Sequence, residues 1–378
     1  MQRRQFVKFV AAGLSVWHIP DVIIAGNNAS ASKKLIWVIL RGGMDALDTI
    51  IPTFEKSLRS YRPSTFISNT ESLLSLDSGF AFHPSLSRLH QLYSEGQLAP
   101  IVAVGSGYRE RSHFAAQDYL ESGLPQSDPD SGWLARAIDR QNYSALSIAN
   151  AIPVSLRSSA SVSTWYPSKL KPATDEIYRQ LKVLYQEDEL LTARLAEGQD
   201  LRTMSGMVPS AKRRHNFSDL CQSCAKLMTE TEAFNCATLE LGGWDTHHNQ
   251  KQRLSRNLKQ LDDGLFILKQ GLGDRWKDCV IVCATEFGRT VKENGTAGTD
   301  HGTASAMLVM GGAVNGGKVL GKWPGLAAQD LHEFRDLRPT SNSFAWLATI
   351  LRQHWCVDEQ TIATIFPAIS SYNTRLII

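Results

Sequence analysis

Short, continuously apolar runs that alternate with helical patterns are the feature that most constrains the fold of this chain. Strands that are apolar along their whole length are buried on both faces, so they need helices on both sides of a sheet. We therefore expect an α/β fold with a mainly parallel sheet sandwiched by helices. Runs rich in β-branched residues predict strands at 35–40, 98–104, 234–241, 280–284 and 306–310. Apolar residues at helical spacing predict helices at 86–93, 114–121 and 253–272.

The middle of the chain differs from this pattern. Residues 144–207 are more polar, with a stretch of small residues at 157–163 and a charged helical pattern between 174 and 198. A chain of 378 residues is long enough for one large domain or two ordinary ones. We expect a single domain over 32–378, with about 144–207 forming a partly helical insertion or cap over the sheet.

The N-terminus predicts export. Arg3 and Arg4 precede Phe6, Val7 and Lys8, and a weakly apolar stretch follows, which resembles a twin-arginine signal over residues 1–31. An ordinary basic helix is the alternative. The signal implies the twin-arginine translocase as a partner during export, and a periplasmic or extracellular location. No uninterrupted apolar run approaches the ~20 residues of a membrane span, so we expect no stable span in the mature protein.

Charge and cysteine usage exclude several functions. The net charge is +3 and the sequence has no basic tract, so we expect no nucleic-acid partner. The sequence has six cysteines, and three lie in strand-like runs where free cysteine behaves as a small hydrophobe. Cys221 and Cys224 form a C-x-x-C in a helical pattern without a second pair to complete a zinc site. Packing or a local disulfide is the favoured interpretation of this pair over redox catalysis.

Polar, glycine-flanked loops follow the predicted strands. The carboxyl ends of parallel strands share one edge of a sheet, and ligands bind there, so these loops predict a common site. Asp and His side chains are suited to zinc, manganese or iron, although a single Asp-x-His-His could also be a polar surface turn. The candidate residues, in chain order, are Arg41 and Asp45 after the first strand, Arg109, Arg111, Ser112 and His113 after the second, Asp245, His247 and His248 after the third, Glu286 and Arg289 after the fourth, and Asp300 and His301 before the fifth.

Four arginines in these loops favour an anionic ligand. Arg41, Arg109, Arg111 and Arg289 carry guanidinium groups, which match phosphate, sulfate or carboxylate oxygens in a two-pronged way. Ion pairing with nearby acidic side chains is the alternative. Ser112 precedes the helix at 114–121, where free N–H groups favour an anion and a lowered hydroxyl pKa. An N-cap role for Ser112 is compatible with this.

The motifs in these loops also resemble a known family. Arg41-Gly-Gly-Met-Asp45, Tyr108-Arg-Glu-Arg-Ser-His-Phe114, Gly242-Gly-Trp-Asp-Thr-His247, Thr285-Glu-Phe-Gly-Arg-Thr290 and Gly298-Thr-Asp-His-Gly302 look like the signature blocks of the domain of unknown function 1501 family. The resemblance covers nearly the whole chain. It implies a fold similar to the alkaline phosphatase and sulfatase superfamily, whose members hydrolyse phosphate or sulfate esters, or move phosphoryl groups, with one or two metal ions.

The resemblance implies roles for individual residues. Asp45 matches a metal-binding Asp after the first strand, and Ser112 matches a nucleophile at a helix start. Asp245 with His247 or His248, and then His301, look like later metal ligands. At the fourth strand this chain has Glu286-Phe287 where relatives present Asp-His, so Glu286 can ligate but Phe287 cannot. This departure favours a single-metal site, a different metal preference or an inactive relative.

Two main hypotheses follow. The first is a hydrolase of a small anionic ester or glycan that uses a divalent metal, namely Zn, Mn, Mg or Ca. Its nucleophile would be Ser112 or water, with charge stabilised by Arg109 or Arg111. Its remaining substrate-binding candidates are Arg41, His113, Arg289 and Asp300. The second hypothesis is a non-catalytic exported binding or scaffold protein that retains the fold. A serine hydrolase ranks third, because no G-x-S-x-G surrounds Ser106 or Ser112.

Overall fold

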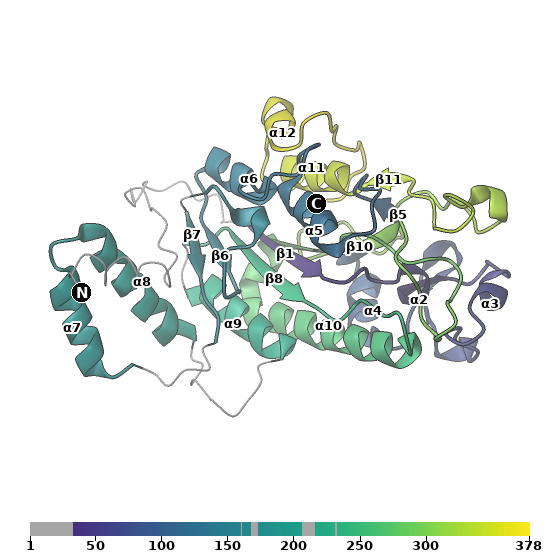
Figure 1. Ribbon diagram of the computed structural model, residues 1–378, viewed down its shortest axis with the longest axis horizontal. Helices are drawn as coiled ribbons and strands as arrows, with labels where there is room; N and C mark the ends of the chain where they lie inside the picture. Colours follow the sequence, from purple (N-terminus) through teal and green to yellow (C-terminus); the bar gives the residue numbers. More distant parts are fainter. Residues whose placement is uncertain (1–32, 160, 168–172, 206–215, 231–232) are drawn as a thin grey trace.

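An eight-stranded sheet runs through the middle of the molecule (Figure 1). The computed structural model describes residues 33–159, 161–167, 173–205, 216–230 and 233–378, so the predicted export signal at 1–31 lies outside the described residues. The strands lie in the order β11-β5-β10-β9-β1-β8-β6-β7. Their bounds are β1 Lys34–Leu40, β5 Leu98–Gly105, β6 Ala145–Ser147, β7 Val162–Thr164, β8 Cys236–Leu241, β9 Cys279–Ala284, β10 Ser305–Met310 and β11 Ser341–Asn342.

The sheet is mainly parallel, which confirms the predicted fold class. β1 pairs in parallel with β8 on one side and with β9 on the other. β10 runs antiparallel to both of its neighbours, β9 and β5. Because β10 is reversed, it begins at the edge of the sheet where β5 and β9 end. The loop before β10 therefore lies at that edge.

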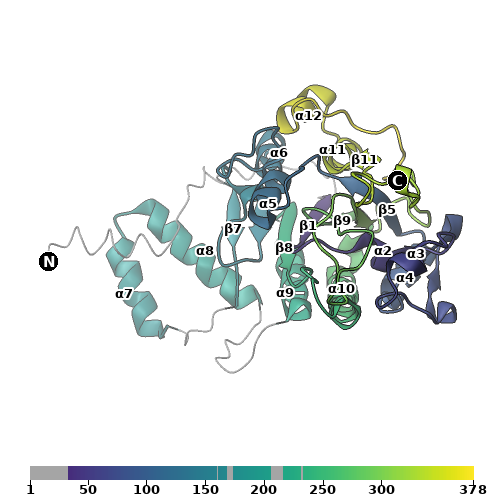
Figure 2. The same cartoon turned by 45° about the vertical axis from the view of Figure 1, so that its right-hand side comes forward.

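Alternate residues of each strand pack into two separate hydrophobic cores. In β1, Ile36 and Val38 point into one core, whereas Leu35 and Trp37 point into the other. In Figures 1 and 2 one group of helices lies below the sheet and the other above it. The lower helices are α4 Ser87–Ser94, α9 Phe217–Glu230 and α10 Gln250–Leu272. The upper helices are α5 His113–Ser122, α6 Trp133–Gln141, α11 Ser343–His354 and α12 Glu359–Ile365.

The long helix α10 shows how the sequence pattern produces this packing. Its leucines Leu254, Leu258, Leu261, Leu265 and Leu268 recur at three and four residues and are all buried. Burying each such side chain contributes roughly 1.5–3 kcal/mol relative to exposure. The helix begins at Gln250 rather than at the predicted 253, because the first turn carries polar side chains that the leucine pattern does not include.

The range predicted as an insertion contributes to the main sheet in its first part. β6 and β7 add two parallel strands beyond β8, and helices α7 Asp175–Tyr185 and α8 Glu189–Ser205 follow. Figure 1 shows α7 and α8 extending outward beyond β7. The single charged helix expected here is two helices, and α8 starts where Asp188 accepts a hydrogen bond from the Leu191 N–H at 3.0 Å.

A small second sheet lies beyond the carboxyl end of β1 and was not predicted. It contains β2 Ile50–Pro52, β4 Phe80–Phe82 and β3 Leu74–Ser75, with the short helices α2 Ala46–Thr49 and α3 Leu58–Tyr61 beside it in the chain. These strands have only two or three residues, which is too short for an alternating pattern to stand out.

The cysteines of the sheet and of α9 serve packing. Cys221 and Cys224 are buried in α9 and form no disulfide, and the three strand cysteines are likewise buried and free. Burial raises the pKa of Cys224 to about 12, so its thiol stays protonated and unreactive. Among the described residues, no helix is long and apolar enough to cross a membrane.

Candidate functional site

Three histidines and one carboxylate converge at the edge of the sheet where β1, β5, β8 and β9 end. The Asp245 Oδ1 atom lies 3.0 Å from His247 Nε2, 3.3 Å from His301 Nε2 and 3.4 Å from His113 Nε2. The Nε2 atoms of His247 and His301 are only 2.9 Å apart. The ligand atoms of His113, Asp245 and His301 all lie within 4.8 Å of one another. We call these four residues the His/Asp cluster.

The second ring nitrogen of each histidine lies beside an acceptor. An Nδ1–H that donates to such an acceptor leaves Nε2 with a free lone pair, the form in which imidazole binds metals. The Nε2 of His113 is buried and has no hydrogen-bond partner among the described residues. The pairs are His113 with Glu286 Oε1 at 2.7 Å, His247 with Asp300 Oδ1 at 3.1 Å, and His301 with the Arg111 carbonyl at 2.9 Å.

This arrangement fits a cation. Lone pairs on His247 and His301 that face each other at 2.9 Å repel, unless a proton or a metal ion lies between them. In a tetrahedral zinc site with bonds of ~2.0–2.1 Å, ligand atoms are separated by about 3.3 Å. Four of the separations are 2.9 to 3.4 Å and close to that value, namely those of Asp245 Oδ1 from the three Nε2 atoms and that between the Nε2 atoms of His247 and His301. Three imidazoles with one carboxylate are also a donor set that suits zinc.

The carboxylates of the site are held in the ionised form. Burial raises the pKa of Asp245, but the hydrogen bond and charge of Arg289 outweigh this and bring it to about 2. Burial likewise acts to raise the pKa of Glu286, and the hydrogen bond from His113 outweighs it, so that the pKa is lowered. A hydrogen bond from Asn294 and another from His247 lower the pKa of Asp300. The site therefore keeps negative charge that a cation can neutralise.

The histidines differ in their proton affinity. The hydrogen bond to Glu286 raises the pKa of His113, with burial acting against it. Burial lowers the pKa of His301, and the nearby charges of His113 and Arg289 act in the same direction. His113 is therefore more readily protonated than His301.

Arg289 connects Asp245 of the cluster to the backbone of Gly42 and Gly43. The guanidinium is wholly buried, lies 2.6 Å from Asp245 Oδ1, and also donates to the carbonyls of Gly42 and Gly43. Gly42 has φ +123°, and a Cβ there would lie 2.5 Å from the Asp245 N atom. Only glycine allows this approach, which accounts for the paired glycines after β1. Arg289 is thus buried beneath the cluster and paired with Asp245.

The comparisons with known proteins place this chain in a family. The sequence model described as "Protein of unknown function (DUF1501)" matches residues 32–366. The chain belongs to the DUF1501 family. This confirms the predicted family. No curated protein matches the chain.

The DUF1501 chain is also similar to solved structures at low sequence identity. They include the C-terminal periplasmic domain of EcEptC from Escherichia coli in complex with Zn, with a TM-score of 0.39 and 9% identity over 76% of this chain and 74% of that one. A phosphonate monoester hydrolase of Agrobacterium radiobacter has a TM-score of 0.39 and 10% identity, over 77% and 70% of the two chains. A protein in the alkaline phosphatase superfamily from Vibrio parahaemolyticus has 0.37 and 11%, over 93% and 74%.

The structure does not bring Asp45 into the cluster of this DUF1501 protein. Asp45 is fully buried, and its Oδ1 lies 2.8 Å from the Arg62 guanidinium. Its Oδ2 accepts hydrogen bonds from Gln250 at 2.8 Å and Thr299 at 3.3 Å. Asp45 therefore binds Arg62, Gln250 and Thr299 instead of joining the imidazoles.

Two other predicted metal ligands also lie outside the DUF1501 cluster. His248 is exposed and turned toward Arg253, at 3.4 Å. Glu286 is buried behind His113 and also accepts from the Gly42 N–H at 2.8 Å, so it orients an imidazole instead of facing the centre. Asp300, predicted to bind substrate, has the corresponding position behind His247. His113, also predicted to bind substrate, is itself a member of the cluster.

Phe287 forms the apolar wall of the DUF1501 site. Its ring centroid lies 4.8 Å from that of His113 and 5.0 Å from that of His301, and its side chain is buried. Phe287 therefore packs the two histidines in place. Among the described residues, one group of three or more His, Cys, Asp or Glu side chains could hold a metal ion, namely His113, Asp245 and His301.

The predicted catalytic residues lie at the outer side of the cluster. Ser112 is exposed at the N-cap of α5, and its side chain makes no cap hydrogen bond, which leaves the hydroxyl available. Arg111 pairs with Glu333 at 2.9 Å, and Arg109 is exposed. Arg41 lies 3.5 Å from Glu240, in a pair that is partly open to solvent.

Sequence reasoning missed the buried partners of this DUF1501 site. Arg62 lies outside every motif loop, so no spacing rule pointed to its pairing with Asp45. It is 17 positions beyond Asp45, yet it makes ion pairs with both Asp45 and Asp48. The signal for His113 was present, since it directly follows Ser112 at a helix start.

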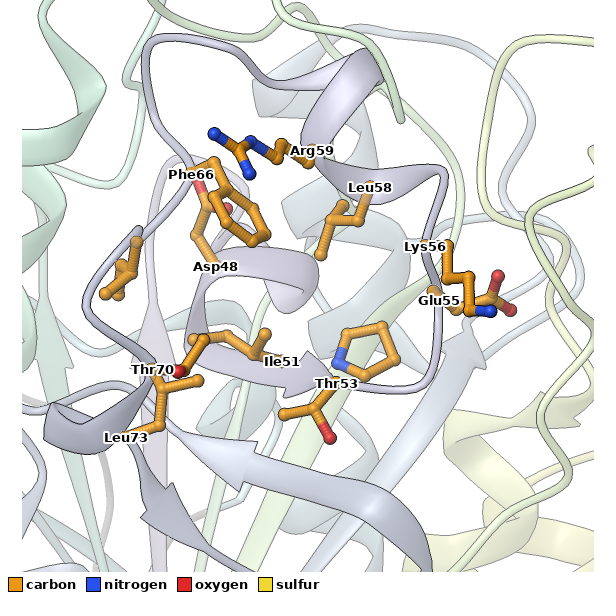
Figure 3. A pocket seen from close by; sticks show the side chains of 12 residues that line it. Asp48, Ile51, Thr53, Glu55, Lys56, Leu58, Arg59, Phe66, Thr70 and Leu73 are labelled. Carbon is orange, nitrogen blue, oxygen red and sulfur yellow. The ribbon is translucent and has the colours of Figure 1, made fainter.

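A separate cavity of about 230 Å³ opens near Asp48 (Figure 3). Figure 3 shows Leu58, Ile51 and Phe66 turned toward it, with Arg59 beside Phe66. Asp48 is its buried polar residue, and it accepts from Gln250 at 2.8 Å. The cavity is mostly apolar, and no residue of the His/Asp cluster lines it.

Proposed function

We propose that this chain is a metal-dependent hydrolase of phosphate or sulfate esters, with one divalent cation held by His113, Asp245, His247 and His301. One observation carries the proposal. Three imidazoles turn their Nε2 atoms toward one carboxylate, while each Nδ1 is held by an acceptor. That pairing of ligand and supporting hydrogen bond is typical of metal centres.

When bound, the cation would polarise a phosphoryl or sulfuryl oxygen and lower the pKa of a nearby hydroxyl or water. In the overall reaction, a water oxygen bonds to phosphorus or sulfur and the bond to the alcohol oxygen breaks. One proton of that water passes to the leaving alcohol oxygen. The second is released or remains on the product anion. Monoesters of phosphate or sulfate are thus hydrolysed to an alcohol and an inorganic anion, and diesters to an alcohol and a monoester.

Ser112 is the proposed nucleophile. The chain is fixed on both sides of it, because the Arg111 carbonyl accepts from His301 and His113 belongs to the cluster. The start of α5 also supplies free N–H groups that favour an anion. If Ser112 attacks, its oxygen bonds to phosphorus or sulfur, the bond to the alcohol oxygen breaks, and the hydroxyl proton passes to the leaving alcohol oxygen. A water oxygen then bonds to phosphorus or sulfur, the bond to the Ser112 oxygen breaks, and a proton of that water returns to Ser112. Arg109 and Arg111 would stabilise charge on the equatorial oxygens.

The proposed setting is the periplasm or the extracellular space. The paired arginines Arg3 and Arg4 support export by the twin-arginine route. The proposed substrate is a small anionic ester or glycan. Zinc is the first cation to test, because imidazole and carboxylate are its usual ligands, with Mn, Mg and Ca as alternatives.

The test combines metal analysis with turnover. We expect about one equivalent of metal per purified chain, and hydrolysis of some members of a broad panel of phosphate and sulfate monoesters and diesters. His301→Ala should lose both, whereas His248→Ala should keep both, because His248 lies outside the cluster. Stoichiometric metal without turnover on the whole panel would count heavily against the hydrolase.

A non-catalytic exported binding protein is the second candidate. It is favoured by the buried ion pair of Asp45 with Arg62, because Asp45 is then withheld from any second metal site. A protein that contains no stoichiometric metal, yet binds an anionic glycan, would support this candidate over the hydrolase.

A further inference from the structure

Two highly exposed phenylalanines are connected to the His/Asp cluster through their immediate neighbours. Phe114 is 75% exposed and Phe334 is 79% exposed. A large aromatic ring that is exposed to solvent does not stabilise the fold through burial. Two such rings near one polar site therefore suggest a binding role.

Phe114 is fixed next to the cluster by the chain itself. It is the second residue of α5 and directly follows His113, and Ser112 stands at the cap of the same helix. The Arg41 guanidinium lies 6.0 Å from the centre of its ring. The ring therefore belongs to the same helix start as His113 and the proposed nucleophile, and lies near a cation.

Phe334 is carried by a strained loop. His332 and Asp336 close this loop with two backbone hydrogen bonds of 2.8 and 2.9 Å. Within it, Glu333 has φ +53° and Phe334 has φ +56°, a conformation that residues other than glycine rarely adopt. Backbone strain of this kind persists where the surrounding structure imposes it, and it concentrates at functional sites.

The strained loop is tied to the site at two points. The Glu333 carboxylate lies 2.9 Å from Arg111, whose carbonyl accepts from His301. The buried Asp336 accepts a hydrogen bond from the Thr303 hydroxyl at 2.9 Å, two residues beyond His301. The loop of Phe334 is thus tied to Arg111 and Thr303, whereas Phe114 directly follows His113.

We propose that Phe114 and Phe334 bind a ring in the alcohol part of the substrate, so that the substrates are phosphate or sulfate esters of aromatic or other ring-bearing alcohols. This inference rests on the proposed hydrolase function. The anionic group binds at the His/Asp cluster, and the ring stacks against one or both phenylalanines. Arg41 lies near the Phe114 ring, and Glu333, which pairs with Arg111, directly precedes Phe334. Charged groups next to both phenylalanines favour a small polar ester over a wide apolar surface such as a membrane.

The experiment compares ligands that differ only in the ring. Phenylphosphonate and methylphosphonate carry the same anionic group and are not hydrolysed, so calorimetry with the zinc-loaded protein measures ring recognition alone. We expect phenylphosphonate to bind at least about 10-fold more tightly, and each substitution Phe114→Ala or Phe334→Ala to reduce that preference by about 3- to 10-fold. The same change should appear in kcat/KM for phenyl phosphate relative to methyl phosphate.

Ile378→Ala is the matched control. Ile378 is 76% exposed, and its N–H bonds to Ala313, beyond the end of β10 and on the opposite edge of the sheet. This variant should keep the full preference. Equal binding of the two phosphonates to the wild-type protein would overturn the ring proposal alone. Failure of both phosphonates to bind, with no turnover of any ester, would overturn the hydrolase and the ring proposal together.

A second variant separates the ring from stability. Phe334→Gly removes the ring and also relieves the positive φ, so we expect unchanged or higher thermal stability together with loss of the phenyl preference. Retention of the preference in Phe334→Gly would contradict the role of this ring. Binding of the wild-type protein to phosphatidylglycerol vesicles that is lost in both Ala variants, with ester preference unchanged, would instead assign the rings to a membrane surface and overturn the proposal.

Discussion

The Asp45 carboxylate and the Arg62 guanidinium form an ion pair of 2.8 Å in which both side chains are wholly buried. Burial acts to raise the pKa of Asp45, but the charge and hydrogen bond of Arg62 outweigh it and lower the pKa. Arg62 also lies 2.9 Å from Asp48 and donates to the carbonyls of Thr290 and Val291. The pair therefore joins the loop after β1 to the loop after β9.

Asp45→Asn should lower stability more than it affects metal binding. Removing one partner of a buried ion pair leaves an uncompensated charge and costs about 3–5 kcal/mol, with the lower end expected because Asp48 still faces Arg62. Denaturant unfolding of the metal-free protein measures this loss. Asp263→Asn, which disrupts a partly exposed pair with Lys259, should cost no more than about 1 kcal/mol. Loss of the metal at unchanged stability would show that Asp45 is a ligand after all.

His113→Ala should weaken zinc binding by more than about 100-fold, since a lost ligand costs more than a lost supporting residue. His248→Ala is the matched control. It removes the imidazole of His248, which follows His247 in the chain but faces Arg253 and not the cluster. Calorimetric titration of the metal-free proteins with zinc measures both. Equal weakening in the two variants would contradict the ligand set proposed for this site.

Glu286→Gln should reduce zinc affinity by about 10- to 100-fold without unfolding the protein. The amide oxygen can still accept from the Gly42 N–H, but it no longer supplies a charged acceptor for the His113 Nδ1–H. Glu240→Gln is the control, because its carboxylate faces Arg41 in a partly exposed pair. An unchanged affinity in Glu286→Gln would mean that the orientation of His113 does not depend on this hydrogen bond.

The sheet could be predicted because its central strands are apolar on both faces. β1, β9 and β10 are buried along their whole length, and runs of this kind and length are typical of the central strands of a covered sheet. β6 and β7 were missed because strands of three residues carry too little pattern. Their pairing depends on β8, to which the chain returns only after α7, α8 and α9.

The site could be predicted only in part, for a different reason. The meeting of Asp245, His247 and His301 follows from topology, since their loops share one edge of the sheet. Which carboxylate faces the centre depends on partners that no spacing reveals, as the pairing of Asp45 with Arg62 shows. Glu286 has the right chemistry for a ligand, but the hydrogen bond to His113 Nδ1 gives it a supporting position.

Stability should fall in mild acid because of His354, far from the cluster. Burial lowers the pKa of His354 to about 4, although a hydrogen bond to the Lys34 carbonyl acts in the opposite direction. The Nε2 lies 3.0 Å from that carbonyl, and the Nδ1 is buried without a partner among the described residues, so a second proton there would have no acceptor. The imidazole is therefore neutral in the folded protein.

The direction of the pH effect follows from the two states of His354. Between the ordinary pKa of 6.5 and the folded value of about 4, the unfolded chain binds the proton and the folded protein does not. The free energy of unfolding should thus decrease as pH falls from about 6.5 to about 4, by on the order of 3 kcal/mol from this residue. About one pH unit above 6.5 the residue should contribute little pH dependence, because the imidazole is then largely neutral in both states.

His354→Gln should remove this part of the pH dependence. Denaturant unfolding midpoints are measured at about pH 7.5, 6.5, 5.5 and 4.5 for the metal-free wild-type and variant proteins. The midpoint of the wild type should fall more steeply below about pH 6.5 than that of the variant, so that the difference between the two narrows. If the variant loses packing interactions, its midpoints fall by a similar amount at every pH, and the slope of midpoint against pH can still be compared. His248→Gln, which changes an exposed imidazole, should follow the wild-type slope. Parallel curves for wild type and His354→Gln would show that the buried imidazole does not resist protonation in the folded state.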